Sequence, residues 1–259
     1  MPNIELITIF SVIVFASALA YKSSFLHNKK IGYISLLQVF YLILIPGILY
    51  SLIFSYILEV LDRPLNKNVF LKDSLLITFL LLSVLYTYGG VAIHSICKTL
   101  NSYFEEKQSL AFKVNSYFHR DFSHNLVFIG AIATGTFFAL LELNHSSPYP
   151  EQSKFLIIIL NGLFVGLASI LGLSFYKEKS WLELKFFFLS LWIMIIVLGY
   201  AARTYLKVLK SYPFTLMMLI VFSFLASLNI FLFVRRFKHK IKVIWRIPKN
   251  AKDTIHFRH

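Results

Sequence analysis

The chain has 259 residues, of which 58% are hydrophobic, and a formal net charge of +14 at pH 7. This composition leaves no stretch of about 50 polar residues for a separate soluble core, and the single Cys97 excludes an intrachain disulfide. The charge does not indicate a nucleic-acid partner, because nine of the 26 Lys and Arg residues lie in the tail Arg235–His259, directly after an apolar segment.

Seven segments contain no Asp, Glu, Lys or Arg. A helix of about 20 apolar residues crosses the ~30 Å of bilayer hydrocarbon, and the segments approach or exceed this length. The sequence therefore predicts an all-α polytopic membrane protein, with one domain of seven transmembrane helices over residues 1–234 and a basic tail over 235–259. The segments are Leu6–Tyr21, Ile31–Leu58, Ser74–Cys97, Phe122–Leu141, Phe155–Tyr176, Phe186–Ala202 and Ser211–Val234.

The positively charged loops orient the chain, because Lys-rich and Arg-rich loops stay in the cytoplasm. Of the 26 Lys and Arg residues, 19 fall after the first, third and fifth spans or in the tail. We therefore expect the N-terminus outside and the C-terminus in the cytoplasm, across the cell (inner) membrane. Ala18-Leu19-Ala20 resembles a cleavage site, but the segment before it has Glu5 and no Lys or Arg, so it is predicted to be a span and not a signal peptide.

The second span contains Pro46-Gly47 near its middle. Proline lacks a backbone donor and clashes with the preceding turn, so a kink is expected there. A packing role explains this kink more simply than a gating hinge does.

After the third span, apolar residues recur at helical spacing between residues 99 and 118, while Glu, Lys, Ser and Asn fill the other face. This pattern predicts an amphipathic helix over about 99–118. The helix would lie on the cytoplasmic interface or continue the third span.

The fifth span contains Gly162 and Gly166, and small residues four apart let two helices approach closely. Packing within the chain is the favoured explanation. A homo-oligomer or another membrane protein as partner stays open.

One group of residues suggests chemistry. His94 and Cys97 end the third span, and His119 and His124 begin the fourth, so the predicted topology brings them together on the cytoplasmic side. Imidazole and thiolate are ligands for zinc, and a bound metal can generate hydroxide from water at neutral pH. These four residues are the candidate ligands for Zn or a similar divalent metal. Asp121 would orient an imidazole or cap the fourth span. Alternatively, the histidines are ordinary residues at helix ends.

The run His119-Arg120-Asp121-Phe122-Ser123-His124-Asn125 resembles the His-Arg-x-x-Thr-His-Ser run of a bacterial family of membrane-bound metal-dependent hydrolases. The resemblance implies metal-dependent hydrolysis, although the Asp-rich segment that precedes this run in the family is absent. Seven spans and an inward C-terminus are also similar to the alkaline ceramidases, which hydrolyse a lipid amide with zinc. The His-x-x-x-His pair in the last span of those enzymes has no counterpart in Ser211–Val234.

Few other polar groups lie deep in the spans, and a permease usually needs such groups near the midplane. The candidates are Gln38, Asn161 and Asn229. The tail carries residues predicted to contact anionic lipid headgroups. These residues are Arg235, Arg236, Lys238, Lys240, Lys242 and Arg246.

Three functions follow from these observations. The first is a non-catalytic membrane component, such as a scaffold, an assembly partner or a sensor input. The second is a membrane-embedded metal-dependent hydrolase that uses the histidine group on a lipid-type substrate. The third is a permease for a small neutral or apolar substrate.

Overall fold

The computed structural model describes residues 4–146, 152–173 and 185–245, and the side chains of 152–153 and 236–245 are left aside. The fold is all-α, about 85% helical, and the described residues include six helices long and apolar enough to cross a membrane. The chain is therefore a helical multi-pass membrane protein. The six helical stretches are Leu36–Leu61, Asp73–Asn101, Leu110–Asn144, Lys154–Leu173, Lys185–Ser211 and Pro213–Arg235.

The chain begins with the 17-residue apolar helix α1 and continues through a short hairpin into the first long helical run. Gly32 has a φ of 60° and lies in the two-residue turn of this hairpin, where a left-handed conformation is needed. The elements are α1 (Ile4–Ala20), α2 (Ser24–Asn28), β1 (Lys30–Ile31), β2 (Ile34–Ser35), α3 (Leu36–Val39), η1 (Phe40–Leu44) and α4 (Ile45–Leu61).

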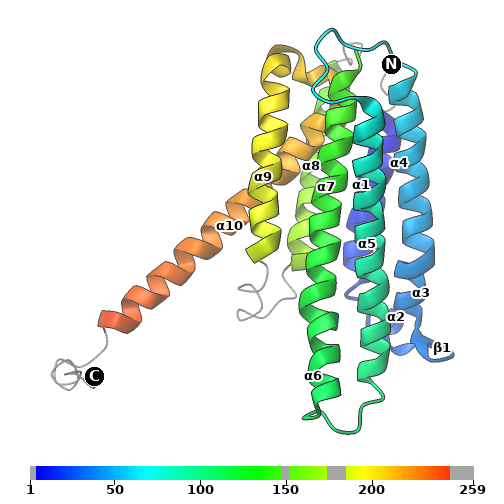
Figure 1. Cartoon of the computed structure of the whole chain (residues 1–259), viewed down its shortest axis with the longest axis vertical. Helices are drawn as coiled ribbons and strands as arrows, with labels where there is room; N and C mark the ends of the chain where they lie inside the picture. Colours follow the sequence, from blue (N-terminus) through cyan, green and yellow to red (C-terminus); the bar gives the residue numbers. More distant parts are fainter. Residues whose placement is uncertain (1–3, 147–151, 174–184, 246–259) are drawn as a thin grey trace.

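The remaining elements pass up and down beside these helices (Figure 1). Helix α10, orange in Figure 1, crosses obliquely, and its C-terminal part leaves the other helices. The elements are α5 (Asp73–Asn101), α6 (Leu110–Tyr117), η2 (Phe118–Phe122), α7 (Ser123–Asn144), α8 (Gln152–Leu173), α9 (Lys185–Ala202), the 3-10 segment η4 (Arg203–Ser211) and α10 (Pro213–Trp245).

The single amphipathic helix predicted over about 99–118 is wrong in its boundaries. Helix α5 ends at Asn101, and a new helical run begins after Ser109, whose side chain accepts a hydrogen bond from the Phe112 N–H. The chain turns between these two positions, and Ser102 and Ser109 donate through their hydroxyls to the Thr99 and Glu106 carbonyls. The α6–η2–α7 run is continuous, so Asp121 lies inside it and is not the predicted N-cap.

The irregularity expected at Pro46 lies just before it. In η1 the backbone widens into a π-helical turn, and the Ile45 N–H bonds to the Phe40 carbonyl five residues back. Proline cannot donate a hydrogen bond to a carbonyl of the preceding turn, so the regular series of backbone hydrogen bonds of the helix is interrupted at the same place. A second π-helical turn, η2, interrupts the run that leads into α7.

Helix α7 is the centre of the bundle, with 67% of its most apolar window buried, against 17–39% in the other candidate spans. It packs most closely on α5, through small residues on both helices. Gly90 faces the Ser123 carbonyl, and Gly130 faces the Thr87 backbone. Gly162 and Gly166 pack against Ile220 and Phe224 of α10, which confirms that this glycine pair serves packing within the chain.

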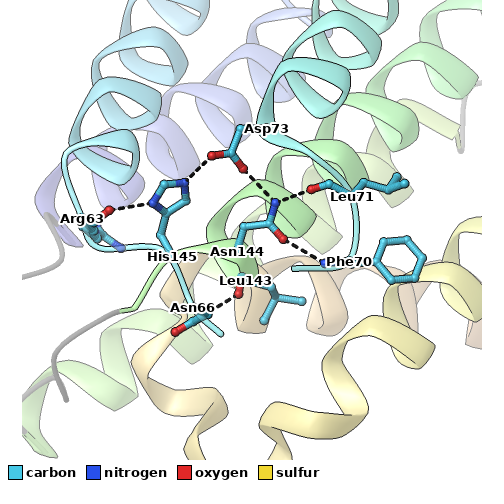
Figure 2. A network of polar contacts seen from close by, with 8 residues as sticks. All are labelled: Arg63, Asn66, Phe70, Leu71, Asp73, Leu143, Asn144 and His145. Atoms are coloured by element: carbon cyan, nitrogen blue, oxygen red, sulfur yellow. Dashed lines mark hydrogen bonds and ion pairs between the residues drawn. The ribbon is translucent and has the colours of Figure 1, made fainter. Parts of the chain in front are cut away.

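A polar network closes the upper end of the bundle (Figure 2). His145 Nδ1 lies 2.8 Å from the Arg63 carbonyl, and its Nε2 lies 3.0 Å from an Asp73 carboxylate oxygen. The Asn144 amide donates to the other Asp73 oxygen at 2.8 Å and to the Leu71 carbonyl at 2.6 Å. These bonds fasten the connection between α4 and α5 onto the end of α7.

Candidate functional site

Three of the predicted site residues meet at the lower end of the bundle. The His94 ring centroid lies 4.5 Å from that of His119 and 4.7 Å from that of His124. His94 Nδ1 and His124 Nε2 are 2.9 Å apart, so these nitrogens form a hydrogen bond with each other. The prediction that the ends of these two spans are neighbours is confirmed, and we call His94, His119 and His124 the histidine cluster.

The π-helical turn η2 presents His119 to this cluster. Its Nδ1 lies 3.2 Å from the Asn101 amide nitrogen, and Asn115 donates to the Asn101 oxygen at 2.7 Å. Since the Asn101 amide is the donor, the ring hydrogen of neutral His119 is on Nε2. His119 Nε2 is buried and has no hydrogen-bond partner among the described residues.

At the other two predicted site residues, the main-chain carbonyls accept hydrogen bonds. Cys97 is buried, and its carbonyl accepts the Asn115 amide at 2.9 Å. Asp121 accepts the Asn125 amide through its main-chain carbonyl, at 2.9 Å. Within the described parts of the chain, no group of three or more His, Cys, Asp or Glu side chains is placed to hold a metal ion. The metal site therefore stays a prediction.

A cavity of about 440 Å³ lies beside the histidine cluster. This volume is in the range of about 300–1,000 Å³ typical of small-molecule sites. Helices α1, α3, α4, α5, α7, α8, α9 and α10 contribute to its walls. Most of the wall is apolar, and examples from its middle are Val91, Ala131, Val165, Met218 and Phe222.

The cavity is elongated along the helices. On α5 its lining runs from Thr87 to Lys98, which at about 1.5 Å per residue is about 16 Å. Its basic and imidazole groups all lie at one end, where α5 ends and α7 begins. Those groups are His94, Lys98 and His124.

Lys98 is the cation at this end of the cavity. Its amine lies 3.1 Å from His27 Nδ1 and 5.6 Å from the centroid of the Tyr21 ring. His27 Nε2 lies 2.8 Å from the Tyr21 carbonyl, which can only accept, so Nε2 carries the hydrogen and Nδ1 accepts from the Lys98 amine. In the described part of the chain, no carboxylate lies within 4.0 Å of the Lys98 amine.

The three polar residues considered for a permease each join neighbouring helices. Gln38 donates to the Ser95 carbonyl at 2.6 Å and to the Thr99 hydroxyl at 2.8 Å. Asn161 donates to Thr8 at 2.9 Å, and Asn229 accepts from the Trp192 ring at 3.2 Å. These bonds give each side chain a role in helix packing.

Sequence reasoning missed Glu142, which directly follows the fourth uncharged segment. Glu142 is fully buried. Its oxygens accept the Phe214 N–H at 3.2 Å and the Thr215 N–H at 2.7 Å, and the Tyr56 hydroxyl lies 2.6 Å away. The carboxylate therefore caps the first turn of α10, and Phe214 in that turn lines the cavity.

Comparison with known proteins adds no assignment to this geometry. No family model matches the chain, and no curated protein and no solved structure matches it. The function must therefore be argued from the cavity and the histidine cluster themselves.

The side chains predicted to contact lipid headgroups lie largely beyond the description. Helix α10 includes Arg235 and continues to Trp245. The side chains of Arg236, Lys238, Lys240 and Lys242, and the whole of Arg246, are outside the described residues.

Proposed function

We propose that this membrane protein is a non-catalytic component that holds one single-chain amphiphile in the cavity between its helices. The observation that supports this proposal most strongly is the distribution of polarity along the cavity. The lining covers about 16 Å along α5 and about 24 Å along residues 37–53, so the cavity is at least as long as half of the ~30 Å hydrocarbon thickness, which is the depth that one lipid chain occupies in one leaflet. The basic and imidazole groups lie only at the end where α5 finishes, so a chain in the apolar part places its polar head there.

The proposal includes a topology of seven crossings, with the N-terminus outside and the C-terminus in the cytoplasm of the cell (inner) membrane. Helix α1 has 17 residues, the lower limit of about 17–25 for a transmembrane helix. It packs against α8 and α4. The distribution of Lys and Arg supports this orientation, which places the histidine cluster and Lys98 at the cytoplasmic leaflet.

Filling the cavity is expected to abolish binding. A Cβ atom added at Gly172 would meet its nearest neighbour, Phe128, at 4.0 Å, so Gly172→Phe places a ring in the cavity without a backbone clash. The probe is hexadecanol with a photoactivatable diazirine in mid-chain, added to purified protein in phosphatidylcholine nanodiscs. We expect wild-type protein to be labelled on the cavity walls, and labelling of the variant to fall at least tenfold, because the ring occupies the volume of the chain.

Gly199→Phe is the matched control. Gly199 is exposed on α9, is not among the cavity-lining residues, and has nothing within 4 Å of an added Cβ. Labelled peptides are mapped by mass spectrometry. The proposal fails if the probe labels only the outer surface of the bundle, or if Gly172→Phe and Gly199→Phe are labelled equally.

The metal-dependent hydrolase is the competing hypothesis for the same residues. It predicts close to one zinc or similar ion per purified chain, and loss of that metal when His94, His119 and His124 are replaced by alanine together. The binding proposal predicts that the hexadecanol probe labels metal-stripped protein as well as untreated protein. Elemental analysis, combined with labelling before and after chelation, separates the two.

A further inference from the structure

We infer that the amphiphile carries an anionic head, a carboxylate or a phosphate monoester, and that Lys98 pairs with it. This inference rests on the proposed function, because it names the chemical class of the ligand in the same cavity. The apolar walls contact the hydrocarbon chain of the ligand, so they do not distinguish one head group from another.

Lys98 lines the cavity, and no Asp or Glu carboxylate of the described residues lies within 4.0 Å of its amine. A cation at the border of the hydrocarbon region is costly unless it is paired. The neighbours that contact its amine are an imidazole and an aromatic ring, and neither of them carries the opposite charge. An anionic head supplies the countercharge that the described residues around Lys98 do not.

The Lys98 amine is held in a fixed position by His27. His27 accepts one hydrogen from the Lys98 amine, and His27 is itself fixed by its bond to the Tyr21 carbonyl. An ammonium group has three donors, so Lys98 keeps donor capacity after this bond is made. The amine is therefore held in place, and it can form a charge-assisted hydrogen bond to an oxyanion without losing its contact with His27.

The polar residues that line the cavity near Lys98 already form hydrogen bonds with one another. His94 and His124 line the same end of the cavity and are joined to each other by their 2.9 Å hydrogen bond. Of the other polar residues of the lining at this level, Gln38 donates to the Ser95 carbonyl, and the Tyr41 hydroxyl donates to the Ser17 carbonyl. Lys98 is thus the group at this end whose charge selects among heads, and the chain of the ligand extends away from it along α5.

The test compares four unlabelled competitors against the hexadecanol probe in phosphatidylcholine nanodiscs: hexadecanoate, hexadecyl phosphate, hexadecanol and inorganic phosphate. Concentrations of the three amphiphiles are expressed as mole fractions in the bilayer, at a pH where both acids are ionised. For wild-type protein, we expect one or both acidic amphiphiles to displace the probe at about 10- to 100-fold lower mole fraction than hexadecanol, the size expected for a hydrogen bond between charged groups. The stronger of the two identifies the head as carboxylate or phosphate.

Three variants complete the test. Lys98→Gln is expected to lose the 10- to 100-fold advantage while hexadecanol still labels the cavity, and Lys98→Arg is expected to retain part of it. Lys29→Gln, at an exposed lysine of the same end whose amine packs on Phe25, is expected to keep all of it.

Equal displacement by hexadecanoate, hexadecyl phosphate and hexadecanol, or an advantage that survives in Lys98→Gln, overturns the inference and leaves the cavity proposal intact. Displacement by inorganic phosphate alone overturns it as well, since no chain would then be needed. Absence of cavity labelling by hexadecanol refutes the proposed function itself.

Discussion

Replacing Glu142 by alanine is expected to lower the free energy of unfolding by about 2–6 kcal/mol, because two buried N–H groups lose their acceptor and each unpaired group costs about 1–3 kcal/mol. The two groups are the Phe214 and Thr215 amides at the start of α10. Tyr212, which precedes Pro213, is not a capping residue, so α10 depends on another element for its first-turn acceptor. Thermal unfolding in detergent, followed by intrinsic fluorescence, measures the change.

Two further variants make the result specific. Glu142→Gln keeps the shape and one acceptor oxygen, so its loss should lie between those of wild type and alanine. Glu105→Ala, at an exposed glutamate between α5 and α6, should change stability by no more than about 0.5 kcal/mol. If Glu142→Ala unfolds together with wild type, then α10 does not depend on this carboxylate, and the packing of α10 on α8 fixes its position without it.

The transmembrane helices could be predicted from the sequence because their signal is local. An uncharged run of about 20 residues has to bond its own backbone in lipid, whatever surrounds it. The residues at which the helices begin and end were harder to predict. The start of the helix at Leu110 is marked in the sequence by the cap Ser109, and the helical periodicity of the neighbouring apolar residues hid it. A cap was one of the two roles predicted for Asp121, and it is wrong because the continuous helix through η2 has no marker in the sequence.

The contact between His94 and His124 could be anticipated, since consecutive spans joined by a short connection are neighbours at their shared end. The cavity could not be, because its volume depends on how all the helices around it pack, and its walls have the same apolar composition as the lipid-facing surfaces. Lys98 entered the sequence argument only as one positive charge among those that set the orientation. The missing cap before Pro213 was the one signal that could have indicated Glu142.

The second large effect is expected at the contact between α5 and α7. An added Cβ at Gly90 would lie 2.8 Å from the Ser123 carbonyl and 2.8 Å from the Val127 nitrogen, and neither backbone atom can move without shifting α7. Gly90→Ala is therefore expected to destabilise the protein by about 1–3 kcal/mol, the usual cost of overpacking. Intrinsic helix propensity alone would make Gly90→Ala stabilising by about 0.5–1 kcal/mol. The expected destabilisation therefore requires that the steric clash outweigh this gain.

Gly89→Ala is the matched variant, at the adjacent residue of the same helix, where nothing lies within 4 Å of an added Cβ. It should leave stability unchanged or raise it slightly, and the opposite signs of the two substitutions would show that α5 and α7 are held by close backbone approach.

Gly90 lies one turn before His94, and Ser123 directly precedes His124, so the same displacement separates the histidine cluster. Gly90→Ala should therefore also weaken competition by hexadecanoate for the cavity, whereas Gly89→Ala should not. Equal behaviour of the two variants in both measurements would mean that α7 can yield at this contact without disturbing the polar end of the cavity.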